Sequence, residues 1–166
     1  MTAPYSHEIQ IHLKRLEIDD RTIEHARVAW TIIKPKLPRL IDQFFGYLSA
    51  TGGGDYFRDA DIPKIKVGQY AYWRSLFSGK FDEVYRAHTG RIGERHRAFG
   101  VDLTYYICAH AWFSEHLFRV IARAAPPAPI KTHDVFMATN KIIYLDLILA
   151  TKGADRGADA DAVMID

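Results

Sequence analysis

The stretch from Arg91 to Gly100 reads RIGERHRAFG and carries the clearest pattern in the sequence. Within it, Ile92, His96 and Phe99 share one face of a helix, because residues three and four positions apart are neighbours on a helical surface. A glycine ends the segment, as is common where helices end. The pattern predicts a short helix that presents an imidazole nitrogen to an apolar ligand.

His96 has competitors, because the chain contains eight histidines and a lone histidine on an apolar face is usually a core or surface side chain. His88 lies two turns earlier and lacks the flanking pattern, so we expect it on the polar surface at a pocket edge. His110 and His116 lie on the next long helix, where packing or dimer contacts are the expected roles. No His-x-x-His or Glu-x-x-His pair occurs, which argues against a dinuclear metal site.

Composition indicates a single globular domain. The 166 residues suit one domain, and a chain of this length needs no disulfide or metal to fold. Hydrophobic residues make up 48% and aromatic residues 13%, enough for a thick core or for the walls of a large apolar pocket. Cys108 is the single cysteine, which excludes an intrachain disulfide and a zinc site built on several thiolates.

Charge and hydropathy argue against two classes of partner. The formal net charge is +2, with lysines and arginines spread along the chain, whereas nucleic-acid binding favours a basic stripe. The first ten residues are polar, unlike a secretory signal, and no apolar run approaches the roughly 20 residues that span a bilayer. We therefore expect a cytoplasmic protein that binds neither nucleic acid nor membranes.

Helical periodicity extends over nearly the whole chain, without the sustained alternation that predicts strands. Asp19, Asp61 and Asp102 each precede an apolar helical stretch, and aspartate is a favoured N-cap residue. The helical stretch that starts at Phe81 is expected to be interrupted at Gly90. The tail over residues 152–166 is rich in alanine, aspartate and glycine, and we expect it to be disordered or to begin a linker.

The last two predicted helices, at 102–124 and 130–151, are apolar around most of their circumference. A helix that is apolar on most sides is buried on most sides. In a domain this small, we expect part of that surface to face a second copy of the protein. The alternative is that both are central helices of a monomer.

Several segments resemble the globin domain of the globin-coupled sensors, a protoglobin-like lineage. Residues 72–85 read YWRSLFSGKFDEVY, similar to the family's LFxGxFDxxY segment, and RIGERHRAFG is similar to its RIGxxHxxxG segment. The paired aromatics Tyr105-Tyr106 and the stretch LIDQFFGYL at 40–48 also match. The resemblance covers roughly residues 6–151. It implies an all-α, modified globin fold: a three-over-three sandwich with an N-terminal pre-helix and no D helix.

The resemblance also implies a cofactor. His96 becomes the proximal ligand of haem b (iron protoporphyrin IX), with Ile92 and Phe99 beside it on the cofactor face. The sixth position of the iron is then left for a diatomic gas: O₂, NO or CO. Tyr106 is implied as the hydrogen-bond partner or near neighbour of His96.

Family members usually form homodimers through their last two long helices, here 102–124 and 130–151, and signal to a C-terminal output module. This sequence contains no such module. The resemblance therefore implies either the sensor domain of a longer protein or a stand-alone sensor globin that acts on a partner signalling protein.

The opposite side of the cofactor departs from the family, because Phe45 stands where oxygen-binding relatives usually carry a tyrosine. Phenylalanine cannot donate a hydrogen bond to bound oxygen, and losing a bond to a charged ligand costs roughly 1.5–3 kcal/mol. Gln69 or Tyr72 could supply the missing donor. Tyr72 could instead bind a propionate, and Gln69 could simply face solvent. Ile65 and Gly68 are expected to line the pocket as spacers.

The leading interpretation is a haem-based gas sensor and not an enzyme. One alternative is a small haem enzyme that acts on NO or peroxide. Phe45 argues against it, because oxygen chemistry favours polar groups beside the bound ligand, and no flavin or nicotinamide motif supplies electrons. The other alternative is a haem-free, globin-like interaction domain, against which the intact His96 segment argues.

Overall fold

The computed structural model describes the backbone of residues 7–57 and 60–163, and the side chains of these ranges as far as Lys152. The described residues form seven α-helices and one 3-10 helix, with no strand among them, which confirms the expected all-α class. The expected domain start at residue 6 lies outside these ranges. The elements are α1 (His7–Arg15), α2 (Asp20–Ile33), α3 (Leu37–Ala50), η1 (Gly53–Phe57), α4 (Ile62–Phe77), α5 (Glu83–Ala98), α6 (Leu103–Ala122) and α7 (Thr132–Val163).

Aspartate side chains start four of the helices. Asp19, Asp61 and Asp102 begin α2, α4 and α6, each accepting a hydrogen bond from the backbone amide three residues later, at 2.7, 3.1 and 2.8 Å. Asp82 begins α5 in the same way, 2.9 Å from the amide nitrogen of Tyr85. These bonds satisfy amides that the first helical turn leaves without a partner. Three predicted N-caps are thus confirmed.

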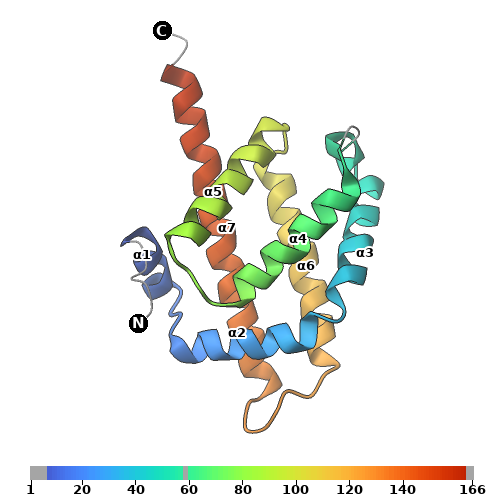
Figure 1. The fold of residues 1–166 in the computed structure, drawn as a ribbon, viewed down its shortest axis with the longest axis vertical. Coiled ribbons are helices and arrows are strands. Elements are labelled where there is room, and N and C mark those ends of the chain that lie inside the picture. The colour runs from blue at the N-terminus through green and yellow to red at the C-terminus, as the bar shows by residue number, and fades with distance from the viewer. Residues whose placement is uncertain (1–6, 58–59, 164–166) are drawn as a thin grey trace.

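The helices are arranged around α7, which runs through the molecule with α5 packed against it (Figure 1). α2 crosses α7 at the lower end in this view and also contacts α4 and α6. α3 packs against α4 and contacts α6. The described part of the segment between α3 and α4 contains η1 and no α-helix, as expected for a globin that lacks the D helix.

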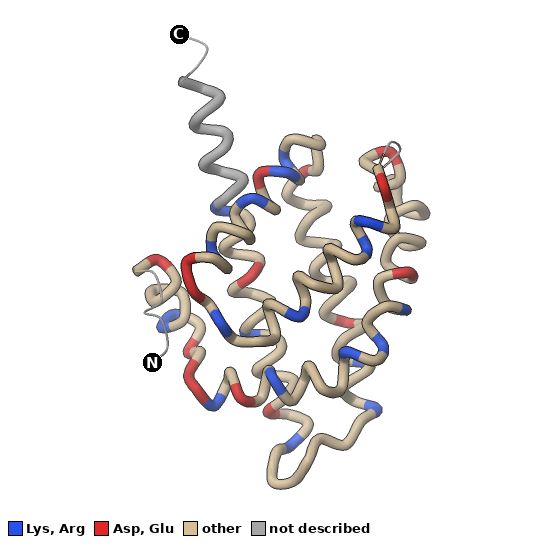
Figure 2. Tube along the Cα trace, viewed as in Figure 1, with Lys and Arg blue, Asp and Glu red and all other residues tan. Residues whose placement is uncertain are grey.

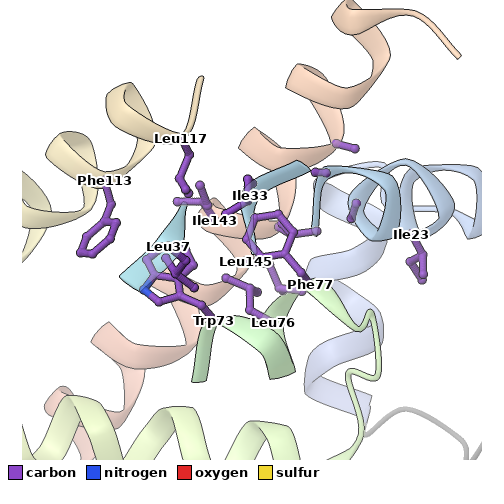
Figure 3. Packing of buried hydrophobic residues seen from close by; sticks show 14 of the residues in the cluster. Ile23, Ile33, Leu37, Trp73, Leu76, Phe77, Phe113, Leu117, Ile143 and Leu145 are labelled. Atoms are coloured by element: carbon purple, nitrogen blue, oxygen red, sulfur yellow. The ribbon is translucent and has the colours of Figure 1, made fainter. Parts of the chain in front are cut away.

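The core fills the space where α2, α4, α6 and α7 meet (Figure 3). Ile33, Leu37, Phe77, Leu117 and Leu145 are fully buried there. Burying a side chain of this size contributes about 1.5–3 kcal/mol to folding. The apolar face of each helix is therefore directed at its neighbours at this end of the molecule.

α5 is continuous through Gly90, so the interruption expected there is wrong. Thr89, Gly90 and Gly93 are all buried on this helix, which packs against α7. A glycine inside a helix costs roughly 1 kcal/mol relative to alanine. Close packing of the helix offsets that cost, and it is a tertiary effect that local sequence does not report.

α7 continues to Val163, past the end expected at Thr151. The backbone of residues 152–163 is helical, so α7 extends into the segment for which the sequence analysis expects a disordered tail or the start of a linker. Alanine is the strongest helix former. Extending an existing helix also avoids the cost of nucleating a new one. Residues 164–166 lie outside the described ranges.

Lysines, arginines, aspartates and glutamates are spread along the described backbone trace (Figure 2). Among the described helices, none combines the length and apolar character that crossing a membrane requires.

α7 buries many of its apolar side chains within the single chain, whereas α6 buries Phe113, Leu117 and Ile121 and leaves its other apolar side chains partly buried or exposed. Leu103 and Ile107 lie one turn apart on α6, and Met137 and Tyr144 lie two turns apart on α7; these four side chains are 45–54% exposed. We call these four residues the α6/α7 apolar surface.

Candidate functional site

A cavity of about 620 Å³ lies between α3, η1, α4, α5 and α6. Its volume falls within the range of roughly 300–1,000 Å³ that is usual for sites of small molecules and cofactors. Among the α7 residues whose side chains the structure describes, Asp146 alone lies in its wall. The cavity brings together all nine residues that the sequence analysis assigns to a cofactor site: Phe45, Ile65, Gly68, Gln69, Tyr72, Ile92, His96, Phe99 and Tyr106.

His96 faces the cavity from the last turn of α5 and is half-buried. Its Nδ1 lies 2.8 Å from the backbone oxygen of Ile92. A carbonyl oxygen can only accept, so Nδ1 carries the proton and Nε2 keeps its lone pair. Burial lowers the pKa of His96, while the bond to Ile92 acts in the opposite direction. The imidazole is therefore neutral at pH 7, the form in which histidine binds a metal.

Tyr106 is the near neighbour of His96 and not its hydrogen-bond partner. The two rings meet edge to face, with centroids 4.9 Å apart and planes at 62°. The partner of Nδ1 is the carbonyl of Ile92, which the sequence analysis did not consider. Burial, followed by the negative charge of Asp146, raises the pKa of Tyr106 well above its ordinary value, so its hydroxyl stays protonated at neutral pH.

Gly93 is buried on α5 and is not among the residues of the cavity wall.

The wall formed by α3 and α4 is mostly apolar. Phe45 packs edge-on against Phe57, with ring centroids 5.6 Å apart, and carries no hydroxyl. Gly68 has no atom within 4 Å of the position that a Cβ would occupy, so it leaves space beside the cavity. Ile65 lies one turn before Gln69 on α4, and both are partly buried.

Gln69 supplies the one orphaned amide of this wall. Its Oε1 is buried and has no hydrogen-bond partner among the described residues. The oxygen and nitrogen of a glutamine amide can exchange places by a flip, so the group can accept from or donate to a ligand. A buried polar atom without a partner is costly in a protein. A polar ligand in the cavity would relieve that cost.

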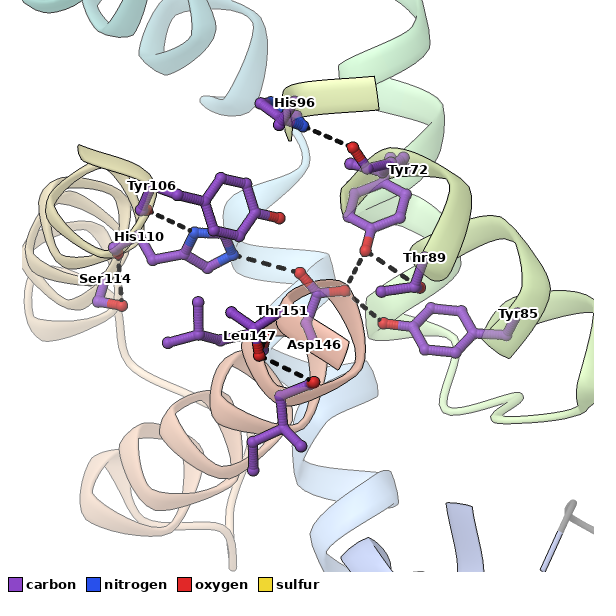
Figure 4. Close-up of polar contacts among 12 residues, drawn as sticks. Tyr72, Tyr85, Thr89, His96, Tyr106, His110, Ser114, Asp146, Leu147 and Thr151 are labelled. Atoms are coloured by element: carbon purple, nitrogen blue, oxygen red, sulfur yellow. Dashed lines mark hydrogen bonds and ion pairs between the residues drawn. The ribbon is translucent and has the colours of Figure 1, made fainter. Parts of the chain in front are cut away.

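The hydroxyl of Tyr72 is not a free hydrogen-bond donor, because it is bonded to Asp146 (Figure 4). Its hydroxyl makes a short hydrogen bond to Oδ1 of Asp146, and its oxygen also lies 3.2 Å from Oγ1 of Thr89. A phenol has one proton to donate, and here Asp146 accepts it. Burial, with the charge of Asp146 next, raises the pKa of Tyr72 well above its ordinary value.

Two further residues of the cavity wall were not assigned to a cofactor site from the sequence. Asp146 is buried in the wall, and the signal that could have found it is one acidic residue within the apolar run 142–149. His110 also lines the cavity, with Nε2 3.4 Å from Oδ2 of Asp146. His116 stacks on Trp112, outside the cavity.

The remaining histidine of the wall, His88, is exposed and meets the ring of Tyr72 edge-on at 5.5 Å, which agrees with its expected place at the pocket edge. No group of three metal-ligating side chains occurs among the described residues. A metal held through His96 would therefore have to bring its other ligands with it. A macrocycle does so.

Fold and cavity together define a globin, and the sequence places the chain more narrowly. A protoglobin family model matches residues 6–156, and the chain belongs to the protoglobin family. The globin domain of the Geobacter sulfurreducens globin-coupled sensor is a similar solved structure. Its TM-score is 0.77 at 22% sequence identity, and the match covers 87% of this chain and 95% of that chain. The expected modified globin fold is thus confirmed. The comparison with curated proteins found no match.

Proposed function

We propose that the chain binds haem b in the cavity and senses a diatomic gas, and that it is not an enzyme. The observation that carries this proposal is the state of His96. Its Nδ1 is held by Ile92, and its Nε2 keeps a lone pair on the wall of a cavity built from apolar and aromatic side chains. Membership of the protoglobin family supports the same cofactor.

The donor set of the cavity fits the group. Ile92 and Phe99 lie beside His96 on the same wall and would contact a flat, apolar macrocycle. Lys64 on α4 and Arg95 on α5 are exposed residues of the wall, and they suit the two carboxylates that a haem carries. Bound haem would supply an iron with one coordination position open to a small gas.

The chain's own residues then decide which gas is favoured. Phe45 cannot donate a hydrogen bond, and the proton of Tyr72 is bonded to Asp146. Gln69 is the donor that this wall leaves available. With a single amide in place of a phenol, we expect oxygen to be held weakly, whereas CO and NO depend less on a donor.

The α6/α7 apolar surface suits a homodimer. Leu103, Ile107, Met137 and Tyr144 all lie on the two helices that the sequence analysis assigned to a second copy. A ligand-dependent change in α6 and α7 would then alter dimer packing and pass the signal to an output module or a partner signalling protein.

The absorption spectrum of the purified protein tests this proposal. We expect a Soret band that is lost in His96→Ala and kept in the matched variant His88→Ala, since His88 is exposed at the cavity edge. A protein that stays colourless after addition of haemin would contradict haem binding and favour the haem-free interaction domain. A Soret band that survives His96→Ala and is lost in His88→Ala would move the iron ligand to His88.

A further inference from the structure

Asp146 is a buried carboxylate at the junction of four helices (Figure 4). It is 2% exposed and belongs to α7. Its Oδ1 accepts hydrogen bonds from the hydroxyls of Tyr72 on α4 and of Tyr85 on α5, the latter at 2.8 Å. Its Oδ2 faces Nε2 of His110 on α6, at 3.4 Å. We call Asp146, Tyr72, Tyr85 and His110 the Asp146 cluster.

The ring of His110 lies between a backbone carbonyl and the carboxylate of Asp146. Its Nδ1 lies 3.1 Å from the backbone oxygen of Tyr106, and its Nε2 lies opposite Asp146. Both ring nitrogens therefore face oxygen atoms, and His110 meets the carboxylate of Asp146 through Nε2.

The members of the cluster differ in one respect that matters for function. Tyr72, His110 and Asp146 line the cavity, whereas Tyr85 is buried outside it. Two side chains of the cavity wall thus make hydrogen-bond contacts with Asp146, the one described α7 side chain that lines the cavity. Apolar packing between helices is non-directional and tolerates small shifts. Hydrogen bonds to a buried carboxylate are directional and costly to break.

We propose that Asp146 is a positioning residue that connects the cavity to α7, so that a ligand which displaces Tyr72 or His110 acts on the last helix through this carboxylate. The proposal rests on the proposed sensing function, and it identifies Asp146 as the residue through which ligand binding affects α7. A buried carboxylate cannot lose a donor without a replacement, so movement of either side chain changes the position of Asp146 or its bonds. α7 also carries Met137 and Tyr144 of the α6/α7 apolar surface.

Amide hydrogen exchange of α7, measured with and without haemin, tests the connection. In the natural protein we expect haemin to change the exchange rates of amides around Asp146 by about tenfold, the scale of one hydrogen bond to a charged group. Asp146→Asn should still take up haemin, measured by its Soret band, while most of the α7 response is lost. An equal response in Asp146→Asn overturns the proposal.

Two tyrosine variants give a matched pair, because both hydroxyls donate to the same oxygen of Asp146. Tyr72→Phe should lose most of the α7 response to haemin, and Tyr85→Phe should keep it, since Tyr85 does not line the cavity. A merely structural role for Asp146 predicts equal effects, and equal effects overturn the proposal. This pair also carries the test if Asp146→Asn does not fold.

A measurement without haem separates failure of the connection from failure of the proposed function. In the haem-free protein, Tyr72→Phe should speed exchange of the α7 amides around Asp146 by about tenfold. The same change made in Asp146→Asn should add little, because the bond is already weakened. Additive effects overturn the proposal whether or not haemin binds. Strong coupling in a protein that takes up no haemin supports the connection and refutes haem as the ligand.

Discussion

Large apolar side chains fill the interior at one end of the molecule and line a cavity at the other end. Around Phe77, Phe81 and Leu117, large apolar residues are fully buried and fill the space between helices. Around the cavity, Phe99 is 63% exposed and Val67 72% exposed, although both lie in its wall. Large apolar side chains therefore stabilise one end by filling its interior, whereas at the other end they form the wall of a cavity.

The packed end and the cavity end differ because different side chains surround their aromatic residues. The packed end is supplied with aliphatic residues at helical spacing on every facing helix. The cavity wall instead includes a glycine, Gly68, and an unsatisfied amide, Gln69. A well-packed core contains neither empty space nor unpaired polar groups. Their presence together distinguishes the cavity wall from the packed core.

The largest expected effect comes from truncating one aromatic at each end. Phe77→Ala should lower the free energy of unfolding of the haem-free protein by about 3–5 kcal/mol, as for other buried aromatics. Phe99→Ala should change it by no more than about 0.5 kcal/mol, because the side chain is largely exposed. Urea unfolding followed by circular dichroism measures both. Similar losses for the two variants would show that the cavity end is packed in solution.

Phe45→Tyr should sharpen the contrast by giving the cavity wall a donor. Oxygen should dissociate from the haem-loaded variant about ten- to a hundredfold more slowly, since a hydrogen bond to a charged ligand contributes roughly 1.5–3 kcal/mol. Dissociation of CO should change little. Stopped-flow measurement of both gases checks this expectation, and equal slowing of both would point to a steric barrier.

Gln69→Ala provides the opposite test in the same measurement. Removing the amide should speed oxygen dissociation by about ten- to a hundredfold, the range for a hydrogen bond to a charged ligand. The free energy of unfolding of the haem-free protein should not fall, because Oε1 of Gln69 has no hydrogen-bond partner to lose among the described residues. An unchanged dissociation rate would exclude Gln69 as the donor.

Neutralising the exposed cations of the wall should have a smaller effect. Lys64→Ala or Arg95→Ala should weaken haemin binding by roughly two- to fivefold, since exposed ion pairs contribute little. The effect should disappear with haemin dimethyl ester, which lacks the two charges. Lys66→Ala is the matched control, because Lys66 pairs with Asp42 on the neighbouring helix at 2.7 Å. Equal weakening with the ester would assign the loss to packing.

Acidification should lower the free energy of unfolding of the haem-free protein through both His12 and His96. We expect this effect to be the smallest of the five. Burial is the main cause that lowers the pKa of His12 in α1 and that of His96 at the cavity. The unfolded chain then binds protons more readily, so haem-free stability is complete above about pH 6.5 and falls as the pH drops through the lowered values. Urea unfolding at pH 7.5 and 5.5 measures this. His12→Gln and His96→Gln should each remove part of the loss, and no change in either would contradict these shifts.

Local patterns predicted much of this molecule, and the reasons are visible in particular residues. Ile92, His96 and Phe99 were expected together because their spacing places them on one helical face and their segment resembles the globin-coupled sensors, and all three line the cavity. Asp61 and Asp102 were identified because an N-cap bonds an amide only three residues away. Both kinds of signal lie within one or two turns of helix.

Contacts between distant segments were not predicted. Asp146 lies 74, 61 and 36 positions from Tyr72, Tyr85 and His110, so its partners are defined only by the fold. Gly90 was read as a break because glycine weakens an isolated helix, whereas α5 is stabilised by packing on α7. The features that were not predicted therefore depend on contacts between segments that are distant in the sequence.

The length of α7 has a mechanical consequence. One unbroken helix contains Asp146 and continues to Val163. At 1.5 Å of rise per residue, the distance along the axis between these two positions is about 25 Å. A continuous hydrogen-bonded helix resists twisting, so a small rotation of the segment around Asp146 turns the distant end by a similar angle. A rotation of α7 beside the cavity would therefore reach residues about 25 Å farther along the helix axis.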